Sequence, residues 1–111
     1  MDKLTEKKCV PCEGGVEPMK HAEFKQYLEQ VKEWKVFNDE EIEREFVFKD
    51  FKEALGFVNK VGVLAEEEGH HPDILLYKWN RVNITLSTHA IGGLSINDFV
   101  MASKIDLLFA S

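Results

Sequence analysis

The sequence lacks long apolar runs and is poor in cysteine. No apolar stretch reaches the roughly 18 residues that a membrane-spanning helix needs, and the first residues, MDKLTEKK, lack the apolar segment of a signal peptide. The 2 cysteines, Cys9 and Cys12, are too few for the disulfide framework of a small secreted domain. We therefore expect a cytoplasmic protein without membrane contact.

Positive charge is also scarce. The chain has 14 Lys and Arg against 20 Asp and Glu, which gives a net charge of -6. Because nucleic-acid binding needs clustered cations, we expect no direct contact with DNA or RNA. A chain of 111 residues can bury its own core. We expect a single domain over residues 1–111, with residues 1–18, which contain Pro11, Pro18 and Gly14-Gly15, as an extended arm.

The first half of the chain predicts a helix and then a hairpin. Alternating runs over Trp34–Phe37 and Ile42–Phe48, separated by the turn signal Asn38-Asp39, predict two antiparallel strands. Before them, apolar residues recur at helical spacing from His21 to Glu33, and the stripe that we expect to be buried consists of Phe24, Tyr27, Leu28 and Val31.

The next segment predicts a long helix followed by two more strands. Asp50 has the form of a helix cap, and Gly69 is expected to end this helix. Strands follow over Ile74–Tyr77 and Val82–Thr88. The connection between them contains Trp79, which we interpret as a packing residue because an indole buries a large area.

A last helix is predicted from a capping pair, Ser95 and Asp98. The order of elements is then α-β-β-α-β-β-α, which predicts an α+β fold with a single antiparallel four-stranded sheet and three helices on one face. Apolar residues of the last helix off its stripe favour self-association. The expected stripe consists of Ile96, Phe99, Val100, Ser103 and Leu107, and the apolar residues off it are Met101, Ile105 and Leu108.

One stretch, Glu66-Glu67-Glu68-Gly69-His70-His71-Pro72-Asp73, breaks the local rules of folding. It places carboxylates at a helix end, where the helix dipole favours cations. Gly69 is expected in the left-handed conformation, and Pro72 holds His71 extended, so both imidazoles lie on a fixed exit from the helix. Because histidine titrates near neutral pH, the pair can supply a general acid and a general base.

A third histidine, His89, follows the strand Val82–Thr88 and precedes a loop with Gly92-Gly93. A lone histidine is usually an incidental surface or core residue, but the grouping of His70, His71 and His89 in two tight contexts favours a shared functional site. Zinc binding is the next interpretation. The spacing argues against it, because adjacent residues of an extended segment point to opposite faces.

Two other features have simpler interpretations. Asp98 fits a capping carboxylate at the start of the last helix, and it could also face a polar ligand bound near His89. Cys9 and Cys12 would form half of a zinc ribbon, but the chain has no second CxxC and His21 is the only nearby third ligand. We therefore expect no metal there.

A longer pattern joins these residues. It runs from Phe48-x-Asp50-Phe51 through Glu66-x-x-x-His70-His71-Pro72, Trp79, Leu86-Ser87-Thr88-His89 and Gly93-Leu94-Ser95 to Asp98. This pattern resembles the signature of the pterin-4a-carbinolamine dehydratase family. In some members an arginine stands before the final aspartate, where this chain has Asn97, so an ionic contact from that position is missing.

The resemblance implies the same α-β-β-α-β-β-α fold, a homodimer or homotetramer, and no metal or organic cofactor. The implied reaction converts 4a-hydroxytetrahydrobiopterin to quinonoid dihydropterin and water, the recycling step after aromatic amino acid hydroxylation. Carried over by position, His70, His71 and His89 would be catalytic, with His70 and His89 as the acid and base pair in either order. His71, Pro72 and Asp98 would hold the pterin and support the site.

Two alternatives stay open. The chain could be a non-catalytic dimerisation or assembly cofactor that binds a protein partner, since related proteins can lose catalytic residues and keep the fold. It could also dehydrate another pterin, linked to molybdopterin metabolism. The presence of all three histidines with Asp98 weighs against the first. The expected partners are thus a pterin substrate, further copies of this chain and an aromatic amino acid hydroxylase of the same pathway.

Overall fold

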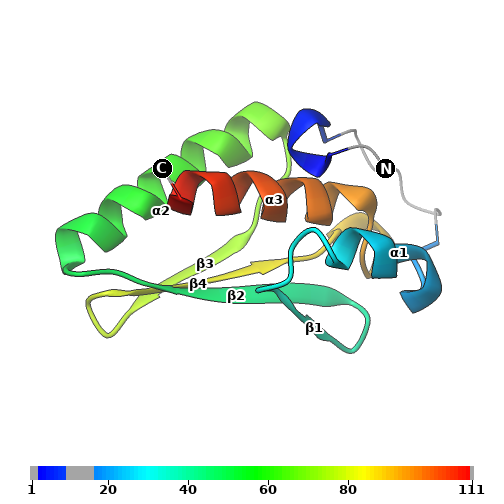
Figure 1. Cartoon of the computed structure of the whole chain (residues 1–111), viewed down its shortest axis with the longest axis horizontal. Helices are drawn as coiled ribbons and strands as arrows, with labels where there is room; N and C mark the ends of the chain where they lie inside the picture. The colour runs from blue at the N-terminus through cyan, green and yellow to red at the C-terminus, as the bar shows by residue number, and fades with distance from the viewer. Residues whose placement is uncertain (1–2, 10–16, 111) are drawn as a thin grey trace.

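The computed structural model describes residues 3–9 and 17–110, and the predicted order of helices and strands is confirmed (Figure 1). No helix among these residues is long and apolar enough to cross a membrane. The elements are the 3-10 helix η1 (Leu4–Glu6), α1 (His21–Leu28), β1 (Lys35–Phe37), β2 (Glu41–Val47), α2 (Phe51–Glu68), β3 (Asp73–Tyr77), β4 (Arg81–Leu86), the 3-10 helix η2 (His89–Ile91) and α3 (Ile96–Ala110).

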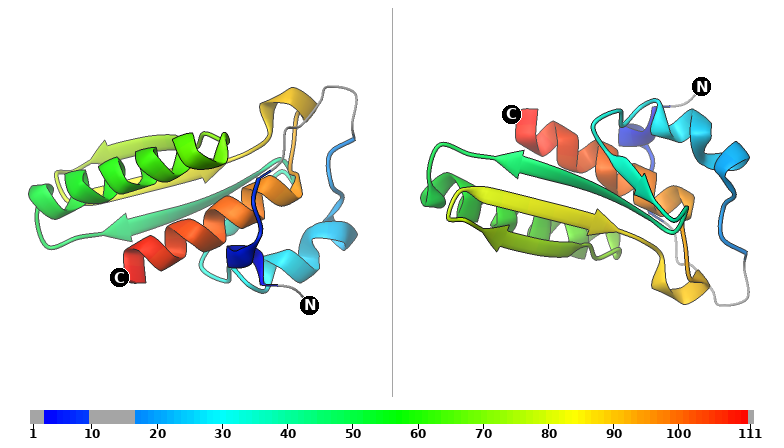
Figure 2. Two further views of the ribbon diagram at one scale, coloured as in Figure 1. Left: turned by 90° about the horizontal axis from the view of Figure 1, so that it is seen from above. Right: turned by 90° about the horizontal axis from the view of Figure 1, so that it is seen from below.

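The strands form one antiparallel sheet in the order β1-β2-β4-β3. Figure 2 shows the helices over one face of this sheet and the strands uncovered on the other, so the predicted fold class is confirmed. Both hairpin turns use positive φ angles at non-glycine residues, Asn38 and Asp39 in the first turn and Lys78 and Trp79 in the second. Trp79 is 60% exposed at this turn, so its interpretation as a packing residue was wrong.

The core lies between the sheet and the helices. Alternate residues of β2 and β4 face the helices, as their period of two predicts. α2 contributes every third or fourth residue, which is the spacing of one helix face. The fully or almost fully buried side chains of these three elements are Ile42, Phe46, Ala54, Phe57, Val61, Ala65, Val82, Ile84 and Leu86.

α1 is shorter than its apolar spacing predicts. It ends at Leu28, and the amides of Gln30 and Val31 then bond to carbonyls three residues earlier, a tightening typical of helix ends. Val31 is nevertheless buried, with 1% of its surface exposed. The buried position predicted for Val31 is therefore correct, although the helix ends before this residue.

α3 is buried on more sides than the predicted stripe. Met101 and Ile105 were expected off the stripe and are fully buried, whereas Leu107 was expected on it and is 55% exposed. The reason is that α3 contacts α1, α2, η1 and β4, so neighbours cover most of its circumference. Met101 and Ile105 are therefore covered within the chain and are not a surface for self-association.

The described parts of the N-terminal arm pack onto the domain. Leu4 in η1 is fully buried, and its amide donates to Oε1 of Gln30 at 3.1 Å. The amide of Met19 donates to the carbonyl of Leu94 at 2.8 Å. The arm expected over residues 1–18 thus contains a 3-10 helix that is anchored to the domain, and a second anchor at Met19 follows it. Residues 10–16, with Cys12, lie outside the described residues.

Candidate active site

Three segments that are distant in the sequence meet at one end of the molecule, where α2 ends, β4 ends and α3 begins. Gly69 ends α2 with a φ of 65°, the left-handed conformation that was predicted. The amide of His70 still bonds to the carbonyl of Ala65 at 3.2 Å, so the backbone of His70 is fixed to the last turn of the helix. The predicted helix exit therefore positions this histidine rigidly.

His70 is paired with a buried carboxylate. Its Nε2 lies 2.7 Å from Oδ1 of Asp98, and the two side chains are 11% and 0% exposed. An ionised carboxylate can only accept hydrogen bonds, so Nε2 of His70 carries the proton of this contact. Within the described part of the chain no hydrogen bond engages the other ring nitrogen, Nδ1. Asp98 does not line the cavity described below, and it reaches the site through His70.

The Asp98 carboxylate is held from its other side by two donors. Its Oδ2 accepts the hydroxyl proton of Thr88 at 2.8 Å and the backbone amide of Ser95 at 3.0 Å. The bond from Ser95 is the carboxylate half of the predicted capping pair at the start of α3. Asp98 is therefore both a helix cap and the partner of His70.

His71 lies on the surface beside its neighbour. Its Nε2 is hydrogen-bonded to Oε2 of Glu66, and both side chains are largely exposed. His70 and His71 thus have separate carboxylate partners, as expected for adjacent residues whose side chains diverge. Among the described residues no group of three His, Cys, Asp or Glu is placed to hold a metal ion.

The three predicted histidines line one open cavity of about 260 Å³. His70 and His71 come from the exit of α2, and His89 comes from η2. A second cavity of about 250 Å³ shares His89 and adds Glu40 and Glu41. Pro72 follows His71 in the sequence but does not line either cavity. The remaining lining residues of the first cavity are Gly69, Ser87, Thr88 and Ala90.

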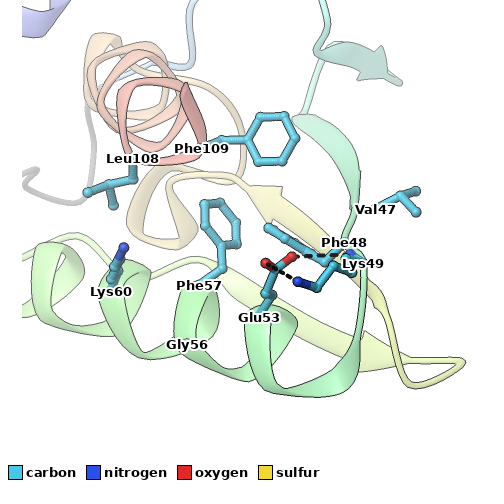
Figure 3. Close-up of a pocket in the computed structure, with 9 residues that line it drawn as sticks. All are labelled: Val47, Phe48, Lys49, Glu53, Gly56, Phe57, Lys60, Leu108 and Phe109. Atoms are coloured by element: carbon cyan, nitrogen blue, oxygen red, sulfur yellow. Dashed lines mark hydrogen bonds and ion pairs between the residues drawn. The ribbon is translucent and has the colours of Figure 1, made fainter. Parts of the chain in front are cut away.

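A larger cavity lies at the other end of α2. It measures about 480 Å³, and Figure 3 shows the rings of Phe48, Phe57 and Phe109 around it. Its charged residues are lysines and Glu53, and Glu53 is hydrogen-bonded to the amide of Lys49. None of its lining residues among the described part of the chain is a histidine, so it does not contain the predicted site residues.

Glu68 fastens the last turn of α2 to its surroundings. Its carboxylate accepts the amide of Cys9 at 2.8 Å and pairs with Nζ of Lys104 at 2.8 Å. Burial opposes its charge, but these donors outweigh burial and hold the pKa of Glu68 below its ordinary value. For Cys9, burial and then the charge of Glu68 raise the thiol pKa to about 12, so this thiol is protonated at neutral pH.

Thr88 is a site residue to which the sequence reasoning gave no role. It continues the alternation of Val82, Ile84 and Leu86, so a side chain at position 88 is expected to face the core. It is 4% exposed, and a buried hydroxyl needs a hydrogen-bond partner. The alternation along β4 therefore indicated that the Thr88 hydroxyl is buried and needs a hydrogen-bond partner.

Comparisons with known proteins agree on one family. Residues 17–108 match the family model described as "Pterin 4 alpha carbinolamine dehydratase". A protein of Alkaliphilus metalliredigens, named provisionally as a pterin-4-alpha-carbinolamine dehydratase, is 57% identical over 107 residues, which are 96% of each chain.

Two solved structures are also similar. One, from Brucella melitensis, is described as a transcriptional coactivator/pterin dehydratase; it is 34% identical, has a TM-score of 0.76, and the match covers 83% of this chain and 98% of that one. The other is a pterin dehydratase-like protein described as a RuBisCO assembly factor in the alpha-carboxysome. It is 25% identical with a TM-score of 0.59, over 70% of this chain and 90% of that one.

Proposed function

Since this chain belongs to the pterin-4a-carbinolamine dehydratase family, we propose that it converts 4a-hydroxytetrahydrobiopterin to quinonoid dihydropterin and water, in the recycling of tetrahydrobiopterin. The observation that carries the proposal is the convergence of His70, His71 and His89 on one cavity. The pairing of His70 with the buried Asp98 supports it, because it orients one imidazole for proton transfer.

The chemistry needs two proton transfers. Hydroxide is a poor leaving group, so an imidazolium protonates the 4a-hydroxyl while the neighbouring ring nitrogen of the pterin expels it as water. A neutral imidazole takes up the proton that the pterin releases. His70 and His89 share these two roles, and each transfer is typically worth about a hundredfold to ten-thousandfold in rate. His71, with Pro72 beside it, holds the pterin.

The test follows the loss of the 4a-carbinolamine by ultraviolet absorbance. We expect a large acceleration by the parent chain and its loss in a His70→Ala, His89→Ala double variant. His21→Ala is the matched control, because His21 lies in α1, is 59% exposed and pairs with Asp39 away from the cavity. A folded parent that gives no acceleration would refute the proposal. Equal losses in the control would show that the effect is not specific to the site.

A second candidate is a non-catalytic dimerisation or assembly cofactor. The RuBisCO assembly factor and the coactivator name of the Brucella protein favour it, as does the uncovered face of the sheet. Under either function we propose a homodimer or homotetramer. A folded parent that lacks dehydratase activity but retains a protein partner through the sheet face would support this candidate.

A further inference from the structure

A short chain of hydroxyl groups lies behind the His70–Asp98 pair. Oγ1 of Thr88 is 2.8 Å from Oγ of Ser95 and 2.8 Å from Oδ2 of Asp98. The carboxylate only accepts, so Thr88 gives it the single hydroxyl proton. Thr88 can then only accept from Ser95, and Ser95 Oγ itself accepts the amide of Asn97 at 3.3 Å. With an ionised Asp98, the hydrogen bonds therefore run in one direction, from the Ser95 hydroxyl to Thr88 and from Thr88 to Asp98.

We propose that Thr88 and Ser95 are positioning residues that set the tautomer of His70. Two donors, the Thr88 hydroxyl and the Ser95 amide, occupy Oδ2 of Asp98. This fixes the carboxylate plane and directs Oδ1 at His70 Nε2, 2.7 Å away. Neutral His70 then carries its proton on Nε2 and presents Nδ1 to a substrate. The catalytic consequence rests on the function proposed above, but the effect on the tautomer does not.

The backbone of Thr88 is held without its hydroxyl. Its amide donates to the carbonyl of Gly93 at 2.7 Å, and its carbonyl accepts from the amides of Ile91 and Gly93 at 3.2 and 3.4 Å. Thr88→Val keeps the shape of the side chain and removes only the hydroxyl. Thr88→Ser keeps the hydroxyl and removes only a methyl group. The two variants therefore separate the hydrogen bond from the packing.

Thr88 lines both cavities beside His89, so direct contact with substrate is the competing role. Its only hydroxyl proton is already given to Asp98. A group that binds substrate would change KM, whereas a group that orients His70 would change kcat and the nitrogen signals of the His70 ring.

The experiment records ¹⁵N NMR of the histidine rings in the free protein, together with dehydratase kinetics. We expect the parent and Thr88→Ser to show neutral His70 with its proton on Nε2, and Thr88→Val to show a mixture of tautomers. In Thr88→Val, kcat should fall about 10- to 100-fold, the range found for groups that orient metal-bound histidines, with KM changed less than about twofold. An unchanged His70 signal in folded Thr88→Val would overturn the proposal, as would a change confined to KM.

Ser95→Ala provides a second test should Thr88→Val fail to fold. It removes the donor to Thr88 and leaves the Ser95 amide bonded to Asp98, so we expect a smaller shift of the same ring signals. Parent-like ring signals in Ser95→Ala would then refute the proposal. Because the NMR measurement needs no substrate, a parent without dehydratase activity would refute the proposed function and leave the positioning role to be decided by the ring signals.

Discussion

Replacing Glu68 with Gln should destabilise the domain by about 2 kcal/mol at neutral pH. The carboxylate lies 2.8 Å from Nζ of Lys104, and the two side chains are only 7% and 15% exposed. A hydrogen bond to a charged group contributes about 1.5–3 kcal/mol, whereas an exposed ion pair contributes about 0–1 kcal/mol. Gln keeps the shape and an acceptor for the Cys9 amide. The loss should therefore come from Lys104, which is left without an opposite charge.

This loss should depend on pH in a defined direction. Burial opposes the charge of Glu68, but Lys104 and the Cys9 amide outweigh it, so the pKa in the folded chain is below the ordinary value of 4.5. A carboxyl whose pKa is lowered by folding stabilises the fold above its ordinary pKa, and this contribution disappears as the pH falls through the folded value. The difference between parent and variant should be complete at pH 7 and shrink below about pH 4.

Unfolding can be followed by the fluorescence of Trp34, which is 3% exposed, at a fixed protein concentration. A loss of about 2 kcal/mol should lower Tm by about 8 °C in a domain of this size. Glu67→Gln is the matched control, because Glu67 is an exposed carboxylate in the same helical turn, and its effect should stay within about 0.5 kcal/mol. The reasoning would be refuted if the two variants were equally stable at pH 7, or if the loss in Glu68→Gln persisted undiminished at about pH 3.

Three further predictions concern other parts of the chain. Because burial raises the pKa of Cys9 to about 12, its thiol should resist iodoacetamide at about pH 8 and react only after unfolding. Peptide mass spectrometry measures the alkylation, and rapid alkylation of the folded protein would contradict this prediction. Gly93→Ala places a Cβ 2.6 Å from Cβ of Pro18 and should cost about 1–3 kcal/mol in urea unfolding. Pro18→Gly in the same chain should reduce that cost, and additive losses would contradict the clash. Trp79→Gly should stabilise the domain by about 1 kcal/mol, because Trp79 has a φ of 56° and is 60% exposed; a lower urea midpoint would refute this.

The periodicity of the sequence predicted the fold because most elements have one buried face. The alternation in β4 and the spacing in α2 each define such a face. Prediction failed where burial depends on tertiary neighbours. Arg44 faces the helices on β2, where it bonds to Asp106 at 2.7 Å, and its guanidinium lies over the ring of Phe46. Only the position of α3 against the sheet provides Asp106, so local spacing could not predict that a charge belongs there.

The sequence indicated which residues belong to the candidate site, but not the hydrogen bonds that connect them. The carboxylates Glu66–Glu68 at the C-terminal end of a helix, together with Pro72 just after it, indicated a functional position for His70 and His71. Local spacing could not show that Asp98 pairs with His70, a residue 28 positions earlier. In the sequence, the role of Asp98 as a helix cap was a sufficient explanation for a carboxylate at this position. Nothing local therefore indicated its second contact, with His70. Thr88 joined them only through the packing of the end of β4 against α3.

Backbone hydrogen bonds, rather than the histidine side chains, hold the segments of the site in place. The backbone at His70 is held by the cap of α2, and the backbone before His89 is held by the pairing of Thr88 with Gly93. Neither anchor uses an imidazole, so the backbone of the site is held without the histidine side chains, although replacing His70 also leaves the buried Asp98 carboxylate without its imidazole partner. A relative can therefore keep this fold as an assembly factor, and similarity of fold does not by itself decide between the two candidate functions. Activity measured with folded histidine variants decides between them, because it varies the chemistry at constant structure.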